Sequence, residues 1–287
     1  MKFFVAALLV TISSLSFACS EDGKSGFMPE NSMRIPVSNK NATGITEAQF
    51  TSVIDSVEKV MTSIISQHGG KLVISRLWTN DEVNAYASRD GRNWNVEMFG
   101  GLARHPALTP DGYTLALCHE IGHHIGGAPK YSGGDWAGVE GQADYYASLK
   151  CMRFIFAEQN NAAAVRKLTV PAAVNTACAK SFSNTNEKNI CIRSALAGQS
   201  IANLFASLRK EPKNPEFTTP STAVAAKLFE SHPATQCRLD TYFQGALCDR
   251  DSREDVSQTE EVKGTCHRLN NDILGFRPTC WFKSARN

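Results

Sequence analysis

The stretch LALCHEIGHHIGGAP, from Leu115 to Pro129, constrains this chain more than any other segment. His119 and His123 lie four residues apart, so on a helix they share one face, with Cβ atoms ~6 Å apart. Two imidazole nitrogens at that spacing can bind one Zn²⁺ at ~2.0–2.1 Å. Glu120 is rotated about 100° around the helix axis, where it can act as a general base toward a water. The H-E-x-x-H pattern therefore predicts a zinc site on a buried helix.

The third ligand has to come from elsewhere in the chain. One class of zinc peptidases places a third His six residues after the second, but Pro129 stands at that position and cannot bind a metal. A Glu from a following helix is the other solution, and VEGQADYY offers Glu140, with Asp144 one turn later. We expect Glu140 to be the third ligand and Asp144 to accept a hydrogen bond from a ligand His. The alternative is that both acids face solvent.

The rest of the sequence predicts a globular α+β chain, mostly α. It has 287 residues, of which 42% are hydrophobic and 20% charged, enough for a substantial core. Strand-like alternation precedes the histidine helix, which favours a small sheet at that place. The expected strands cover residues 71–78 and 93–103. The expected helices cover residues 46–70, 109–125, 137–158, 162–180, 187–208 and 222–230.

The N-terminal residues are typical of an exported protein. A basic start, a short apolar run and small residues before Cys19 predict a signal peptide over residues 1–18. Cys19 is then either a lipidated N-terminal cysteine or the first residue after plain cleavage. We expect the protein in the periplasm, anchored to the outer membrane as a lipoprotein, or secreted. Residues 19–45 are polar and predict a flexible tether.

Eight further cysteines predict disulfides, since their number is even and the chain is exported. They are Cys118, Cys151, Cys178, Cys191, Cys237, Cys248, Cys266 and Cys280. None of the spacings is C-x-x-C, which disfavours a structural cysteine–zinc site. Three of these cysteines fall within residues 246–287 and Cys237 lies shortly before them, so residues 246–287 are interpreted as a cysteine-rich C-terminal extension.

The sequence H-E-I-G-H followed by E-G-Q-A-D resembles the gluzincin metallopeptidases. Within them it is similar to the family of HtpX and the CAAX prenyl endopeptidases, and to its soluble, exported BepA-like type. ESHPATQCRL, from Glu230 to Leu239, resembles a downstream S/T-H-P-x-x-x-x-R segment of that family. The resemblance implies a zincin-like metallopeptidase domain over residues 46–245. It also implies that His232 approaches the zinc, as a ligand or an oxyanion donor, and that Arg238 supports the site or holds a substrate carbonyl.

These features together predict an exported zinc endopeptidase acting on a protein or peptide. Glu120, His232 and Arg238 are its expected catalytic residues, and His119, His123 and Glu140 hold one Zn²⁺. The strand before the histidine helix, residues 93–101, could present an edge to an extended peptide. A net charge of +2 argues against a nucleic-acid partner, and membrane attachment is expected only through a lipidated Cys19. The alternative is an envelope assembly factor or chaperone with a structural or latent zinc site.

Overall fold

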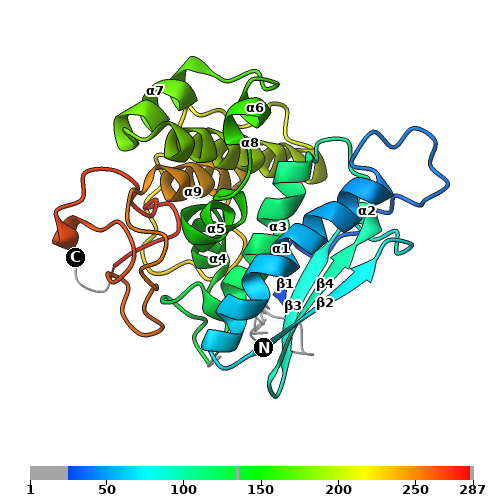
Figure 1. Cartoon of the computed structure of the whole chain (residues 1–287), viewed down its shortest axis with the longest axis horizontal. Coiled ribbons are helices and arrows are strands. Elements are labelled where there is room, and N and C mark those ends of the chain that lie inside the picture. Colours follow the sequence, from blue (N-terminus) through cyan, green and yellow to red (C-terminus); the bar gives the residue numbers. More distant parts are fainter. Residues whose placement is uncertain (1–24, 134–135, 285–287) are drawn as a thin grey trace, which may run out of the picture.

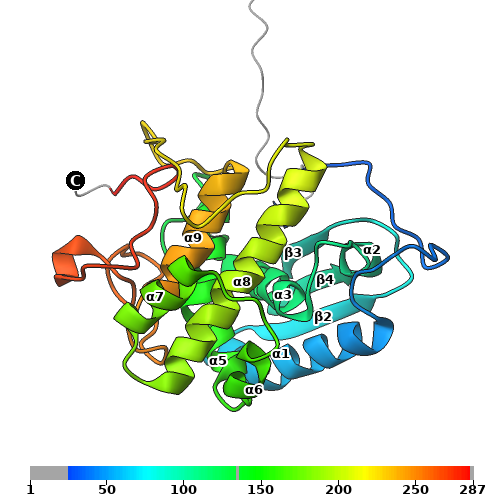
Figure 2. The same ribbon diagram turned by 90° about the horizontal axis from the view of Figure 1, so that it is seen from above.

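The computed structural model of the chain describes residues 25–133 and 136–284. It is an α+β fold made mostly of helices, with one small sheet at one side of the molecule (Figure 1). Helix α3, which carries the histidine motif, lies between this sheet and the helices that follow it in the chain (Figures 1 and 2). The elements are β1 (Ser25–Gly26), α1 (Glu47–Gln67), β2 (Lys71–Leu77), β3 (Ala85–Asp90), β4 (Asn93–Phe99), α2 (Gly100–Ala103), α3 (Pro110–Ile125), α4 (Glu140–Tyr146), the π-helical turn η1 (Ala147–Cys151), α5 (Met152–Phe156), α6 (Asn161–Val165), α7 (Ala172–Ser181), α8 (Thr185–Leu208), α9 (Thr235–Leu247) and the 3₁₀ turn η2 (Arg268–Asn270).

The sheet has the strand order β1-β3-β4-β2. β4 pairs in parallel with β2 on one side and antiparallel with β3 on the other. The expectation that residues 93–101 present a free edge to a peptide is therefore wrong, because both edges of β4 are paired. Strand β3 was not expected from the sequence. Its other side pairs with the short strand β1.

The chain from Ser25 onward packs against the domain, which differs from the tether expected for residues 19–45. Phe27 and Met28 are fully buried, and Ile35 and Ile45 belong to the same core. Backbone bonds continue along the side of β3, from Phe27 N to Ala85 O and from Ile35 N to Asp81 O. The segment is polar in composition, but its few apolar residues cover the edge of the sheet. Residues 1–24, including the expected signal peptide and Cys19, lie outside the described residues.

The helices follow the sequence pattern in part. The expected helix over 137–158 begins at Glu140 and runs through α4, η1 and α5 to Phe156. The expected helix over 162–180 divides into α6 and α7 ahead of Pro171, whose missing N–H interrupts helical bonding. Residues 222–230 form no helix, because Ala225 N and Phe229 N donate to Thr279 O and Trp281 O instead. Helix α9 was not expected.

The four expected disulfides form within one fold, and they fit an oxidising, exported environment. The pairs are Cys118–Cys151, Cys178–Cys191, Cys237–Cys280 and Cys248–Cys266. The boundary expected at residue 246 falls inside α9, and the fully buried Trp281 shares a core with α3. Residues 248–284 are rich in loops, as expected, but they are not a separate unit (Figure 1).

Among the described residues, no helix is long and apolar enough to cross a membrane.

Candidate metal centre

Helix α3 places His119, Glu120 and His123 in the interior of the molecule. Its start is fixed by Thr109, whose side chain accepts a hydrogen bond from Gly112 N at 3.0 Å. Pro110 stands in the first turn, where its fixed φ suits a helix. The helix is buried from Gly112 to Ile125, so its polar side chains need partners inside the protein.

The two histidines and Glu140 bring three ligand atoms together. His119 Nε2 lies 3.1 Å from His123 Nε2 and 3.4 Å from Glu140 Oε2. His123 Nε2 lies 3.7 Å from Glu140 Oε1. All three side chains are buried, and together they could hold a metal ion. Glu140 stands in the first turn of α4, which packs against α3.

The other ring nitrogen of each histidine is held by a hydrogen bond, so that Nε2 faces the cluster. His119 Nδ1 lies 2.7 Å from Asp144 Oδ1, and His123 Nδ1 lies 2.8 Å from the carbonyl oxygen of Gly138. Both oxygens only accept, so each Nδ1 is the donor and carries the proton. Bonds of this kind fix the tautomer and ring orientation of a metal-binding histidine.

Charge and burial act in opposite directions on these ligands. Burial lowers the pKa of His123 to about 4, which keeps its imidazole neutral at physiological pH. Burial also lowers the pKa of His119, but the carboxylates of Asp144 and Glu140 outweigh it and raise that pKa to about 9. Burial would raise the pKa of Glu140, yet His232, His119 and His123 hold it well below its ordinary value. Glu140 is therefore an anion, which suits it to a cation.

Glu120 has the environment of a reactive carboxyl group. Its side chain is fully buried, and neither carboxylate oxygen has a hydrogen-bond partner among the described residues. Burial raises its pKa to about 8. A buried carboxyl group without partners is costly and uncommon, so its position calls for an explanation beyond folding.

Arg238 on α9 is fully buried and holds the carboxylate of Asp144 in place. Its Nε and Nη2 donate to the two carboxylate oxygens of Asp144 at 2.8 and 2.6 Å. The hydroxyl of Tyr242, one turn later on α9, donates to Asp144 Oδ1 at 2.6 Å. Burial would raise the pKa of Asp144, but Arg238 and His119 lower it. Asp144 is thus held as an anion that orients His119.

His232 lies beside the ligand cluster, just before α9. Its Nε2 is 3.4 Å from Glu140 Oε2 and donates a hydrogen bond of 2.8 Å to the carbonyl oxygen of Gly26. Burial lowers the pKa of His232. The structure thus brings all the expected site residues to one place: His119, Glu120, His123, Glu140, Asp144, His232 and Arg238.

Sequence reasoning missed three contributors to the site. The hydroxyl of Tyr131 donates to Glu140 Oε1 at 3.0 Å, Tyr242 holds Asp144, and Phe27 packs edge-on against His119 with ring centroids 5.1 Å apart. Tyr242 follows Arg238 by one helical turn, which would have placed it on the same face had α9 been expected. Nothing local in the sequence signals Tyr131 or Phe27.

Two neighbours of the motif have other roles, in line with expectation. Cys118, next to the first ligand, is bonded to Cys151. The ring of His124 stacks between Trp94 and Trp136, with centroid distances of 5.5 and 4.9 Å. Both are packing residues rather than ligands.

A second grouping of metal-binding residue types, Asp249, Cys266 and Asp272, is less suited to an ion. The sulfur of Cys266 is bonded to Cys248, whereas a metal takes a thiolate. Asp272 is already paired with Arg250 at 2.8 Å.

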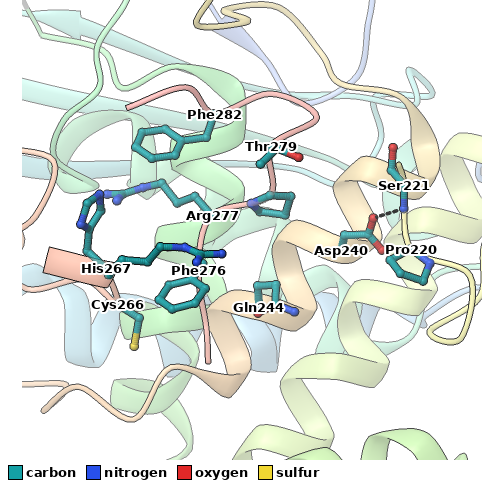
Figure 3. Close-up of a pocket in the computed structure, with 12 residues that line it drawn as sticks. Pro220, Ser221, Asp240, Gln244, Cys266, His267, Phe276, Arg277, Thr279 and Phe282 are labelled. Carbon is teal, nitrogen blue, oxygen red and sulfur yellow. Dashed lines mark hydrogen bonds between the residues drawn. The ribbon is translucent and has the colours of Figure 1, made fainter. Parts of the chain in front are cut away.

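A cavity of about 320 Å³ lies in another part of the molecule (Figure 3). None of the metal-cluster residues lines it. Two of its polar side chains are engaged, since Asp240 accepts a hydrogen bond from Ser221 N and Arg277 Nε donates to Gln142 at 2.7 Å.

Comparison with known proteins finds no matching family model, no matching curated protein and no matching solved structure.

Proposed function

We propose that this protein is an exported zinc-dependent endopeptidase of the gluzincin type, with a zincin-like fold. One observation carries the proposal: three converging donor atoms from His119, His123 and Glu140 lie beside the buried, unpartnered carboxyl group of Glu120. A metal site that only stabilises a fold has no use for such a carboxyl group. A hydrolase needs it as a base.

The spacing of the donors supports zinc as the ion. Ligand bonds of ~2.0–2.2 Å at tetrahedral angles leave neighbouring donor atoms roughly 3.3–3.5 Å apart. The three distances here are 3.1, 3.4 and 3.7 Å. Two imidazoles and one carboxylate are also the ligand set of many catalytic zinc sites, which keep a fourth position for water.

The residues around this site supply the steps of peptide hydrolysis. Zinc, when bound, polarises the substrate carbonyl and lowers the pKa of a bound water to ~7. Glu120 takes the proton of the attacking water and passes it to the leaving amine. The pKa of Glu120, raised by burial to about 8, suits a group that both accepts and donates a proton. His232 Nε2 donates to the carbonyl oxygen as negative charge develops there. Asp144, itself held by Arg238, keeps the imidazole ring of His119 in its orientation.

The proposed location is the periplasm, the outer membrane or the exterior. The four disulfides support an oxidising compartment. Cleavage of a signal peptide after Ala18, and lipidation or plain exposure of Cys19, remain proposals from the sequence. Intact mass of the exported, catalytically inactive variant Glu120→Gln distinguishes a lipidated from a free N-terminus.

A second candidate function is an assembly factor or chaperone whose metal site is structural or latent. The burial of all three ligands, with His232 3.4 Å from Glu140, favours it. A permanently closed site would hold the ion and hydrolyse no peptide. Digestion of casein or a peptide library, with and without a chelator, separates the two candidates.

The variant Glu120→Gln tests the proposed function. It should keep one equivalent of zinc, because Glu120 is not a ligand. Its rate of peptide hydrolysis should fall about 100- to 10,000-fold, because the general base is lost. Zinc content by elemental analysis and initial rates with a quenched peptide are the measurements. The exposed Glu158→Gln, away from the site, is the matched control and should behave as wild type. Undiminished hydrolysis by Glu120→Gln would refute the mechanism.

A further inference from the structure

Residues 25–28 run along the outer side of β3, beside the metal centre. β1 is antiparallel to β3, with Ser25 opposite Ala87 and Gly26 opposite Tyr86. Phe27 N donates to Ala85 O at 2.9 Å, which extends the pairing. An extended peptide that adds a strand to a sheet edge binds in this way, through its backbone.

The polar backbone atoms on both sides of the Gly26–Phe27 bond are held by side chains of the site. His232 Nε2 donates to the Gly26 carbonyl at 2.8 Å, and Arg238 Nη1 donates to the Phe27 carbonyl at 3.1 Å. Asn84 accepts from Met28 N at 2.8 Å and donates to Met28 O at 3.3 Å. These contacts fix the position of the peptide bond closely.

The Gly26 carbonyl is held at the ligand cluster itself. The same His232 nitrogen that donates to it lies 3.4 Å from Glu140 Oε2, a ligand atom. On the other side of the bond, the ring of Phe27 is fully buried, edge-on to His119 at 5.1 Å and to Phe205 at 5.7 Å. A small residue thus precedes the bond and a large apolar residue follows it.

We propose that the enzyme cuts its own chain at the Gly26–Phe27 bond, which is paired with β3 and held by His232 and Arg238 as a bound peptide substrate would be. The inference rests on the proposed function. Water adds to the Gly26 carbonyl carbon, and the bond from that carbon to Phe27 N breaks. Gly26 leaves as a carboxylate and Phe27 keeps the new amino group, with the protons moved by Glu120. The domain then starts at Phe27, and the residues before it are released.

The new N-terminus remains attached to the fold. Phe27 stays buried, Met28 stays bonded to Asn84, and Ile35 N stays bonded to Asp81 O. The cut therefore frees the Gly26 side of the bond without unfolding the domain, while Phe27 stays in place on the other side.

Intact mass and N-terminal sequencing of the exported, zinc-loaded chain test the cleavage. Wild type and the control Glu158→Gln should begin at Phe27, whereas Glu120→Gln should keep the residues before it. Glu120→Gln incubated with wild type should stay uncut, because its bond is held by His232 and Arg238 of its own chain. Three results would overturn the proposal: a Phe27 terminus in Glu120→Gln, equally fast cutting of that variant by added wild type, or an uncut wild type that hydrolyses an external peptide. A wild type that cuts neither itself nor any peptide refutes the proposed function as well.

Hydrogen exchange of uncut Glu120→Gln tests the placement of the segment without any catalysis. The amides of Phe27 and Met28 should exchange at least about tenfold more slowly than in a free synthetic peptide of residues 20–32, because both are bonded. Exchange as fast as in the peptide would show that the segment is not paired with β3.

Discussion

Asp144 is the residue on which the geometry of the metal centre depends most. It is fully buried, and it holds the ligand His119 on one side and the guanidinium of Arg238 on the other. The residue spacing within α3 and α4 was enough to predict His119, His123, Glu140 and Asp144, because helical periodicity sets which side chains share a face. The contacts of Tyr131 and Phe27 could not be predicted, since they depend on how distant segments pack.

The variant Asp144→Asn should weaken metal binding about 10- to 100-fold, because the orientation of His119 is lost. It should also lower the free energy of unfolding by about 3–5 kcal/mol, because Arg238 becomes a buried charge without its counterion. Metal titration and urea unfolding measure the two effects. Asp90→Asn, at an exposed strand end, is the control and should change neither. Unaltered metal affinity in Asp144→Asn would contradict the role given to this residue.

Lys150 in η1 makes stability depend on pH away from the metal centre. It is buried, its Nζ donates to Asp251 O, and burial lowers its pKa to about 8. In the unfolded chain the pKa is ~10.4, so between these values the unfolded state binds more protons than the folded one. The free energy of unfolding should therefore rise between pH 8 and 10.5, by roughly 1–3 kcal/mol. Urea unfolding across this range should show the rise in wild type and lose it in Lys150→Met; an equal rise in both would exclude Lys150 as its source.

At the scale of elements, the site depends on the close approach of α3 and α4. A Cβ at Gly122 would lie 2.9 Å from Ala143 O and 3.0 Å from Ala143 Cα, so only glycine permits this helix contact. Helix α3 was predicted well because its cap and its glycine end are local signals. The helix over 222–230 was wrong, because its backbone N–H groups donate to carbonyls far along the chain. β3 and α9 were missed, although β3 forms a hairpin with β4 across a two-residue turn.

The variant Gly122→Ala should separate α3 from α4 and move Glu140 away from the histidines. We expect the free energy of unfolding to fall by about 1–3 kcal/mol and metal binding to weaken. Gly138→Ala is the matched control, because its nearest contacts would be 3.5 Å or longer. Thermal unfolding with and without zinc measures both effects. If the two variants bind zinc equally well, the spacing of the helices does not control the site.

At the scale of the whole molecule, the C-terminal residues pack against the helix that carries Glu140, although they come last in the chain. Trp281 is fully buried and packs on Gly141, the residue after the ligand Glu140. Cys237–Cys280 fastens this segment to α9. The even cysteine count predicted the disulfides but not their pairing, since pairing depends on the folded topology.

Replacing Cys237 and Cys280 by Ala should lower the free energy of unfolding by about 2–4 kcal/mol. It should also weaken zinc binding, because Trp281 loses its anchor behind α4. The control is the pair Cys178–Cys191, which belongs to a separate small core, so its removal should lower stability but leave zinc affinity unchanged. Denaturant unfolding and zinc titration of both double variants give the comparison. Equal zinc affinity in the two double variants would show that the C-terminal segment does not influence the site.

The disulfide between Cys118 and Cys151 bears on when the proposed peptidase activity would begin after synthesis. It joins the residue before the first ligand to the end of the π turn that follows α4. In a reducing cytosol this link does not persist, and α3 and the helical segment from α4 to η1 are held by packing and hydrogen bonds alone. A newly made chain would therefore hold its candidate metal ligands less firmly until it meets an oxidant, which under the proposed function would delay peptidase activity until the bond forms.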